Sequence, residues 1–265
     1  MLRVSFTTDK YLCYIINNMA KKYEITPEAL NSIEDVMRAG TDRYAIDEIA
    51  GDGFFVRAFK NYPKNTDKDI VAMKIALVDT TNSTNLGRLL GTKDFKDKSG
   101  KMVHKEVFTL SDLVDKIVSM KDFDDRVSSG DVSLVTELIK WGNARGLNAT
   151  SFFSKYCLYH NYISYERDDY SIFDSVVKEN LGRYLTETEV KVLLPGIRLV
   201  HKKNKSESDI IASAVANRIE KMRTDCNYEA YHKLIGDILK LKNIDQTKVK
   251  NPRRKLDYLV WYMNR

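Results

Sequence analysis

Asp174 is the residue whose surroundings most suggest chemistry, because it stands between apolar neighbours in SIFDSVV, just ahead of a helical run, VVKENLGRYL. A carboxylate held at a helix N-terminus stays ionised, and it can stabilise positive charge on a reacting group or position a water. The simpler interpretation is an N-cap alone, whose loss costs about 1 kcal/mol. Lys155 lies 19 residues upstream of Asp174.

Six short polar side chains in a row, residues 80–85, interrupt the segment VDTTNSTNLGRLLG. Helix capping explains one or two of them but explains six less well. Exposed amides and hydroxyls also hydrogen-bond nucleic-acid bases and backbone. The candidate contacts in this cluster are Asn82, Ser83, Thr84 and Asn85.

A polar turn leads into a nearly all-apolar helix in KWGNARGLNATSFFSKYCLYHN, residues 140–161. Backbone N–H groups at such a helix N-terminus bind a phosphate well, although an ordinary helix–helix connection has the same pattern. The candidate phosphate contacts are Lys140, Arg145, Gly146, Asn148, Thr150 and Ser151.

Aromatic side chains near these segments could stack on a planar ligand. The candidates for such a pocket are Trp141, Tyr156, His160, Tyr170 and Trp261. Each of them, taken alone, is more typical of a protein core than of a pocket, and His160 lies on an apolar helix where a satisfied buried histidine is the commoner case.

The elements that must position these residues are amphipathic helices, so the sequence predicts an all-α fold of two helical lobes. Thr26, Ser111 and Ser206 are predicted N-caps. Strand signals are weak and limited to MLRVSFTT, a minor N-terminal β element, and GFFVRAF. The lysine-rich segment 91–106 is predicted to be a solvated linker, with a basic loop over phosphates as the alternative, and 200–209 has the same character.

Composition narrows the class of protein. The chain has 265 residues, 43% of them hydrophobic, a net charge of +6 and no apolar run long enough to span a membrane. The basic excess is compatible with a polyanionic partner without establishing one. Cys13, Cys157 and Cys226 lie far apart and leave an odd thiol, which indicates a reducing cytoplasm and no metal site.

Taken together, these segments resemble the helix-hairpin-helix superfamily of DNA glycosylases over residues 67–265. TTNSTNLGRLLG is similar to the Asn-rich segment of the 8-oxoguanine glycosylase branch, and NATSFFSKYCLYHN with YSIFDSVV is similar to the hairpin, the next helix and the catalytic aspartate, as in divergent stand-alone bacterial members. The resemblance implies a monomer that binds double-stranded DNA, flips out a modified base and excises it with Asp174, without cofactor, metal or membrane. It implies that Asn82 and Ser83 fill the vacated space in the duplex.

Departures from the family pattern bear on the mechanism. The turn reads GLNAT, with Ala149 where a second glycine stands in the family, and Ser151 occupies the position of the family lysine. A monofunctional glycosylase is therefore favoured, with Lys155 as the nucleophile of a bifunctional enzyme as the alternative. Residues 1–66 match no family pattern and are treated as a separate segment of unknown role.

The substrate base is not specified by the sequence. The branch resemblance suggests an oxidised purine, and the divergent turn suggests a rarer base, such as a hypermodified base of phage DNA in antiviral defence. Two other classes of function fit the same residues. One is a non-catalytic DNA-binding protein of the same fold, and the other is an all-α interaction or toxin–antitoxin component in which the polar clusters are only caps.

Overall fold

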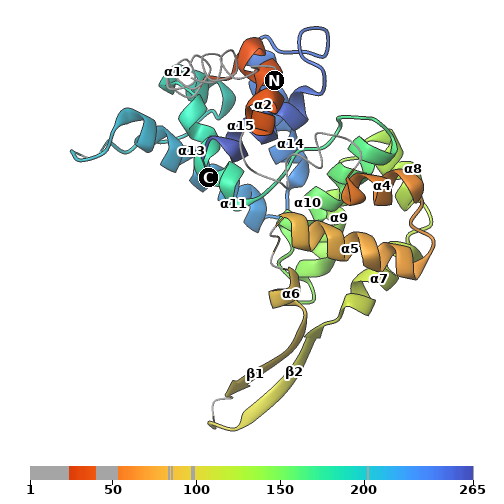
Figure 1. The fold of residues 1–265 in the computed structure, drawn as a ribbon. Helices are drawn as coiled ribbons and strands as arrows, with labels where there is room; N and C mark the ends of the chain where they lie inside the picture. The colour runs from red at the N-terminus through yellow and green to blue at the C-terminus, as the bar shows by residue number, and fades with distance from the viewer. Residues whose placement is uncertain are drawn as a thin grey trace, which may run out of the picture. The chain divides into compact units, whose positions relative to one another are not determined.

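The chain is all-α, as predicted, with one antiparallel hairpin as the exception among the residues that the structure describes (Figure 1). The structure, a computed structural model, describes residues 24–39, 53–82, 84, 86–96, 99–201 and 203–264. The elements up to the hairpin are α2 (Pro27–Ala39), α4 (Phe54–Asn61), α5 (Lys68–Asn82), α6 (Leu86–Leu89), β1 (Gly91–Lys96) and β2 (Met102–Phe108).

The remaining elements are helical. They are α7 (Leu110–Ser119), α8 (Phe123–Ser129), α9 (Ser133–Asn143), α10 (Thr150–Tyr159), the π-helix η1 (His160–Ser164), α11 (Ser175–Asn180), the 3₁₀-helix η2 (Leu181–Tyr184), α12 (Glu187–Leu193), α13 (Glu207–Thr224), α14 (Tyr228–Leu241) and α15 (Pro252–Tyr262). None of the helices in the described ranges is both long and apolar enough to cross a membrane.

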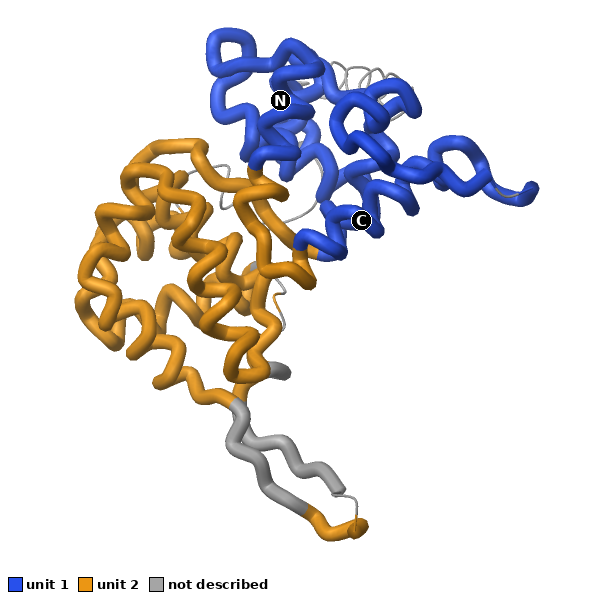
Figure 2. Tube along the Cα trace, turned by 180° about the vertical axis from the view of Figure 1, so that it is seen from behind, with its two compact units in different colours: residues 1–50, 175–222, 233–265 blue, residues 51–174, 223–232 orange. Residues whose placement is uncertain are grey.

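The chain divides into two compact units (Figure 2). Unit 1 contains residues 1–50, 175–222 and 233–265, and unit 2 contains residues 51–174 and 223–232. Both units are therefore built from segments that are distant in sequence. The separate role predicted for residues 1–66 stays a prediction, since 1–23 and 40–52 lie outside the described residues, as does the strand proposed at the N-terminus.

Unit 2 is organised around buried aromatic rings. Phe59 of α4, Phe123 of α8 and Tyr156 of α10 are almost completely buried, and the Phe59 and His160 ring centroids lie 4.9 Å apart. Helix α10 packs against α5, α9 and η1. Because aromatic rings bury large areas, this cluster holds the helix that carries Lys155 in a defined place.

Unit 1 is held together by α15, which packs against α2 and α11. Lys255 is buried and donates from Nζ to Asn31 Oδ1 of α2 at 3.2 Å. In η2, a Cβ on Gly182 would lie 2.7 Å from the Ala212 Cα, so only glycine permits this contact with α13.

Two of the predicted N-caps are confirmed. Thr26 Oγ1 accepts a hydrogen bond from the Ala29 backbone N–H at 3.1 Å, and Ser206 Oγ accepts one from Asp209 N–H at 3.1 Å. The third prediction, Ser111, is wrong. Helix α7 begins at Leu110, and its N-cap is Thr109, two residues before Ser111, in a reciprocal capping box with Asp112.

Two further sequence predictions are corrected. The segment 91–106 is not a linker, because β1 and β2 pair antiparallel and form a two-stranded sheet. GFFVRAF is not a strand but belongs to α4, where Phe55, Val56, Ala58 and Phe59 are buried. Their spacing of one, three and four residues places them on a single helical face, which outweighs the aromatic and β-branched content that favours strands.

Candidate functional site

Asp174 and Lys155 form a buried ion pair in unit 2. Lys155 Nζ lies 3.0 Å from Asp174 Oδ2, and the two side chains are 6% and 7% exposed. Lys155 belongs to the second turn of α10, and Asp174 immediately precedes α11. The structure therefore brings together the two catalytic candidates of the sequence analysis.

Tyrosine hydroxyls from α14 hold the backbone just ahead of Asp174. The Tyr228 hydroxyl donates to the Ser171 carbonyl and accepts from the Ser171 N–H, both at 2.8 Å. The Tyr231 hydroxyl donates to the Ile172 carbonyl at 2.5 Å. These bonds satisfy the peptide groups of a buried extended segment, so the segment has little freedom to shift.

Helix α10 binds the same segment from its other side. Ser154 Oγ accepts a hydrogen bond from the Phe173 N–H at 3.0 Å and donates to the Ser151 carbonyl at 3.1 Å. The Phe173 ring stacks on the Tyr231 ring, with centroids 4.1 Å apart and an interplanar angle of 7°. Phe173 is thus fixed by a backbone bond and by its ring, and Asp174 follows it directly.

The π-helix η1 directly follows α10 and starts the connection that brings Asp174 back beside this helix. Asn161 Nδ2 donates to the Val127 carbonyl at 2.8 Å and to Asp169 Oδ2 at 2.9 Å, while Asn161 Oδ1 accepts from the Asp169 N–H at 3.0 Å. His232 Nε2 lies 2.7 Å from the Asp169 carbonyl oxygen. A π-turn is often found at functional sites, and here it begins the connection that carries the chain back to Lys155.

The predicted turn ahead of α10 is a tight helical hairpin between α9 and α10. Gly146 has φ +81° and ends α9, with the Leu147 N–H bonded to the Gly142 carbonyl at 2.9 Å. A Cβ on Gly142 would lie 2.8 Å from the Leu147 carbonyl oxygen, so glycine is required for this close approach.

The candidate phosphate contacts gather at this hairpin. Lys140, Arg145, Gly146 and Asn148 are exposed, whereas Ser151 is half-buried and Thr150 is 1% exposed. No side chain caps the N-terminus of α10 at Ala149. The Arg145 guanidinium lies 5.0 Å from the centroid of the Trp141 ring. The hairpin therefore offers backbone N–H groups and two exposed cations in one region of unit 2.

The polar cluster at residues 80–85 is at least partly structural. Thr80 and Thr81 donate back to the Ala76 and Leu77 carbonyls of their own helix. The Thr84 hydroxyl donates to Asp79, whose carboxylate also accepts from the Leu86 N–H at 2.7 Å. Asp79, which the sequence analysis missed, thus fixes the start of α6. The Ser83 and Asn85 positions and the Asn82 side chain lie outside the described residues.

The aromatic candidates do not share one environment. Tyr156, His160 and Tyr170 are buried among side chains of unit 2, and their exposed fractions are 0%, 0% and 1%. The hydroxyl of Tyr156 donates to Asn65 Oδ1 at 2.8 Å. Trp141 is half-buried against Phe108, with ring centroids 5.1 Å apart, and Trp261 belongs to α15 of unit 1. The first three rings occupy core positions in this conformation.

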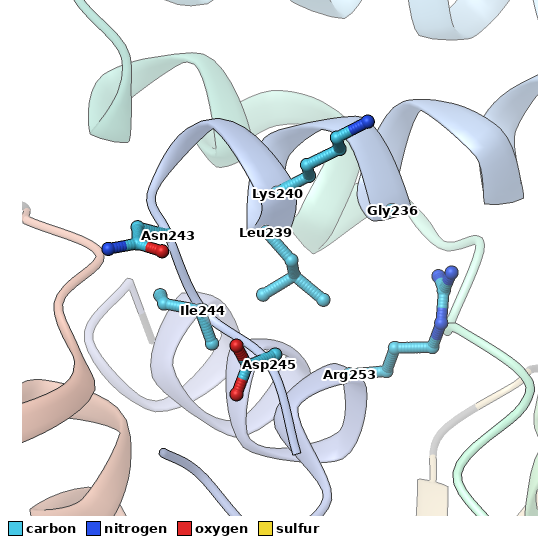
Figure 3. Close-up of a pocket in the computed structure, with 7 residues that line it drawn as sticks. All are labelled: Gly236, Leu239, Lys240, Asn243, Ile244, Asp245 and Arg253. Carbon is cyan, nitrogen blue, oxygen red and sulfur yellow. The ribbon is translucent and has the colours of Figure 1, made fainter. Parts of the chain in front are cut away.

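A surface pocket lies in unit 1, and none of its lining residues is a candidate of the sequence analysis (Figure 3). Its volume is about 320 Å³, and it is lined by the C-terminal part of α14, the following turn and Arg253. The Arg253 guanidinium packs over Gly236, where a Cβ would lie 2.9 Å from Nη2. Asp245 is committed to its own turn, since Oδ1 accepts from the Thr247 hydroxyl at 2.6 Å.

A buried lysine beside His160 is a second feature that the sequence analysis missed. Lys74 of α5 is fully buried, and its Nζ donates to the Lys64 carbonyl at 3.1 Å and lies 3.4 Å from His160 Nε2. Burial lowers the pKa of Lys74 to about 8, although Asp124 opposes the shift. Burial, aided by Lys74, lowers the pKa of His160 well below its ordinary value.

Lys74 predicts a specific pH dependence of stability. Between pH 8 and 10.5 the folded state has lost the Lys74 proton that the unfolded state still binds, so the free energy of unfolding rises with pH through this window. The rise amounts to roughly 3 kcal/mol when complete. Urea unfolding of wild type and Lys74→Met from pH 7 to 10 measures it as a difference between the two slopes.

The matched control for Lys74→Met is Lys121→Met, since Lys121 is exposed. Its unfolding free energy should run parallel to that of wild type. Buried Cys157, whose thiol pKa is raised by burial, lowers stability at alkaline pH in every variant and cancels in the comparison. If the unfolding free energies of Lys74→Met and wild type instead change in parallel with pH, the lowered pKa of Lys74 is contradicted.

In comparisons with known proteins, one family model matches part of the chain. The family model HI_0787_N, described as an N-terminal domain, matches residues 47–169, which is less than half of the chain. The matched range runs from α4 to η1 and ends five residues before Asp174. No curated protein and no solved structure matches the chain. The functional argument therefore depends on the geometry around Lys155 and Asp174.

Proposed function

We propose that the protein is a DNA glycosylase that excises a modified base from double-stranded DNA. The observation that carries the proposal is the ion pair of 3.0 Å between Lys155 and Asp174, directly after a helical hairpin. A lysine and an aspartate so placed are the two groups that N-glycosidic bond cleavage can use, one as a nucleophile and one as an anion beside the sugar.

Asp174 is the group that stabilises the transition state. Breaking the bond between a base and its deoxyribose leaves the electron pair on the base and positive charge on the sugar, as in glycoside hydrolysis. The hydrogen bonds from Tyr228, Tyr231 and Ser154 to the preceding backbone hold the carboxylate in place before the substrate arrives. Such preorganisation makes a charge effective because nothing has to reorient during the reaction.

Lys155 favours the bifunctional variant of this chemistry over the monofunctional one. Lys155 Nζ first passes a proton to Asp174 Oδ2, 3.0 Å away, which frees its lone pair. The neutral amine then bonds to the sugar C1′ while the bond to the base breaks and its electron pair leaves on the base. A Schiff base then forms with the opened sugar, and the strand is cut by elimination. A water positioned by Asp174 replaces the lysine in the monofunctional variant.

The low exposure of the pair fits a nucleotide that leaves the duplex. Side chains that are 6% and 7% exposed do not reach a sugar that remains stacked in the helix. Flipping costs a few kcal/mol and is easiest for a damaged or mismatched base. The hairpin N–H groups with Lys140 and Arg145 would anchor the phosphates beside the extruded nucleotide.

The setting that we propose is cytoplasmic and monomeric, without cofactor or metal. Cys157 and Cys226 are both free thiols, which suits a reducing compartment. The substrate is an oxidised purine or a hypermodified base of phage DNA, and the second would make the protein a defence factor.

Incubation with DNA of varied base content tests the proposal. We expect wild-type protein to cut an 8-oxoguanine duplex or phage genomic DNA, with strand breaks seen on a denaturing gel. Breaks that form without alkali, together with borohydride trapping of a protein–DNA adduct that Lys155→Gln does not form, would establish the lyase. Breaks that need alkali would establish the monofunctional enzyme. Tight binding without abasic sites would leave a non-catalytic DNA-binding protein instead.

A further inference from the structure

The connection between α12 and α13, residues 194–206, is long, exposed and basic. It reads LPGIRLVHKKNKS and contains Arg198, Lys202, Lys203 and Lys205 without an acidic residue. Apart from a turn at Gly196, with φ +79°, and short turns before α13, its described residues have no regular structure. Connections of this length are uncommon in compact domains unless they have a function.

Two cations of this connection have no ion-pair partner among the residues that the structure describes. These are Arg198 and Lys203, which are both exposed. Lys205 Nζ lies 3.4 Å from the Ser213 hydroxyl, and its charge is close enough to Asp209 to help lower the pKa of that carboxyl. Val200 is 65% exposed in the middle of the segment. In Figure 2 the connection extends outward from the rest of unit 1. Arg198 and Lys203 are therefore two exposed cations, on either side of exposed Val200, that no described carboxylate pairs.

The neighbouring carboxylates are already paired. Asp209 lies 3.1 Å from the Arg183 guanidinium and accepts from the Ser206 hydroxyl. Glu187 is paired with Lys191 at 2.5 Å, and His201 lies close enough to Glu187 to lower its pKa further. Glu207, at the first position of α13, adds an exposed negative charge next to the segment. The segment itself has four Lys or Arg residues and no acidic one, so its own charge is positive.

Both ends of the connection are fixed. The Ile197 N–H bonds to the Leu194 carbonyl at 3.1 Å, and the Ser206–Asp209 cap starts α13. A segment that is anchored at both ends loses less entropy when it binds than a free tail does.

We infer that Arg198, Lys203 and Lys205 of the basic connection bind the phosphate backbone of duplex DNA, in addition to the phosphate contacts proposed for the hairpin. This inference rests on the proposed function for its partner. Unpaired lysine and arginine side chains release counterions when they meet phosphates, so the contact strengthens binding to any sequence and depends steeply on salt. The connection would thus provide sequence-independent affinity, while the pair at Asp174 provides the chemistry.

The test is the salt dependence of binding to an unmodified fluorescent duplex by the triple variant R198Q/K203Q/K205Q. Each lost phosphate contact lowers the slope of log affinity against log salt by roughly 1. We expect the slope to fall by roughly 2 to 3, with little change in the melting temperature because the three side chains are exposed and form no salt bridge with any described residue. The matched control, K60Q/K64Q/K121Q, removes three exposed lysines of unit 2 and should keep the wild-type slope.

Three results would overturn the inference. One is an unchanged slope in the triple variant, and another is an equal fall in the control. The third is a loss of binding to phosphatidylserine vesicles or single-stranded RNA as large as the loss on duplex DNA. Cutting of modified DNA by the same preparations reports on the proposed function separately, so a triple variant that cuts normally and keeps its slope refutes only the role of the basic connection.

Discussion

Asp174→Asn will lower the rate of base excision by roughly 10²- to 10⁴-fold, the range over which a fixed charge or general base contributes to catalysis. Asparagine keeps the shape of the side chain, but it removes the charge that would lie beside the sugar. Single-turnover cutting of a substrate duplex, followed by alkali, measures the chemical step. Binding to the same duplex should change little, because the loss lies in the transition state.

A second carboxylate on the same segment is the control for this prediction. Asp168 is 9% exposed, similar to Asp174, and lies six residues before it. Asp168→Asn should cut at close to the wild-type rate, provided that both variants are assayed below their melting temperatures. An Asp174→Asn protein that is folded, binds the duplex and cuts at the wild-type rate would refute the assignment of Asp174 as catalytic.

Helical periodicity was enough to predict the fold class, because apolar residues recur on one face of most segments. The hairpin of β1 and β2 escaped this argument. Its sequence is polar and lysine-rich on both sides, so it shows no alternation of apolar and polar residues. The available signals were the Ser99–Gly100 turn, where Gly100 has φ +81°, and the pairing of Phe95 with Val103 across the strands.

The sequence predicted the two residues of the candidate site, Asp174 and Lys155, but not the contacts that bring them together. The positions of Asp174 and Lys155 came from motif order, while their meeting depends on the π-helix η1 and on hydrogen bonds from a helix more than 50 residues later. Tyr228, Tyr231 and His232 have the i, i+3, i+4 spacing that is typical of one face of a helix. That spacing does not reveal that the Tyr228 and Tyr231 hydroxyls bind the backbone just ahead of Asp174.

The buried Lys155 and Asp174 pair also predicts a large effect on stability. Removing either charge alone leaves the other buried without compensation, which typically costs about 3–5 kcal/mol. Lys155→Met and Asp174→Asn should each lower the free energy of urea unfolding by this amount. The double variant K155M/D174N contains no unpaired charge at the site. Its loss of unfolding free energy should therefore be smaller than the sum of the two single losses, by a coupling energy of about 2–3 kcal/mol.

The chain provides an internal control in the exposed pair of Lys191 and Glu187, which lies at 2.5 Å with side chains 62% and 30% exposed. The same double-mutant cycle there should give a coupling below about 1 kcal/mol, since solvent screens the interaction. Additive losses at Lys155 and Asp174 would show that the two charges do not interact in solution. A double variant that regains stability yet stays unable to cut DNA would instead separate the structural role of the pair from its chemistry, because folding needs only that the charges match, whereas excision needs the anion itself.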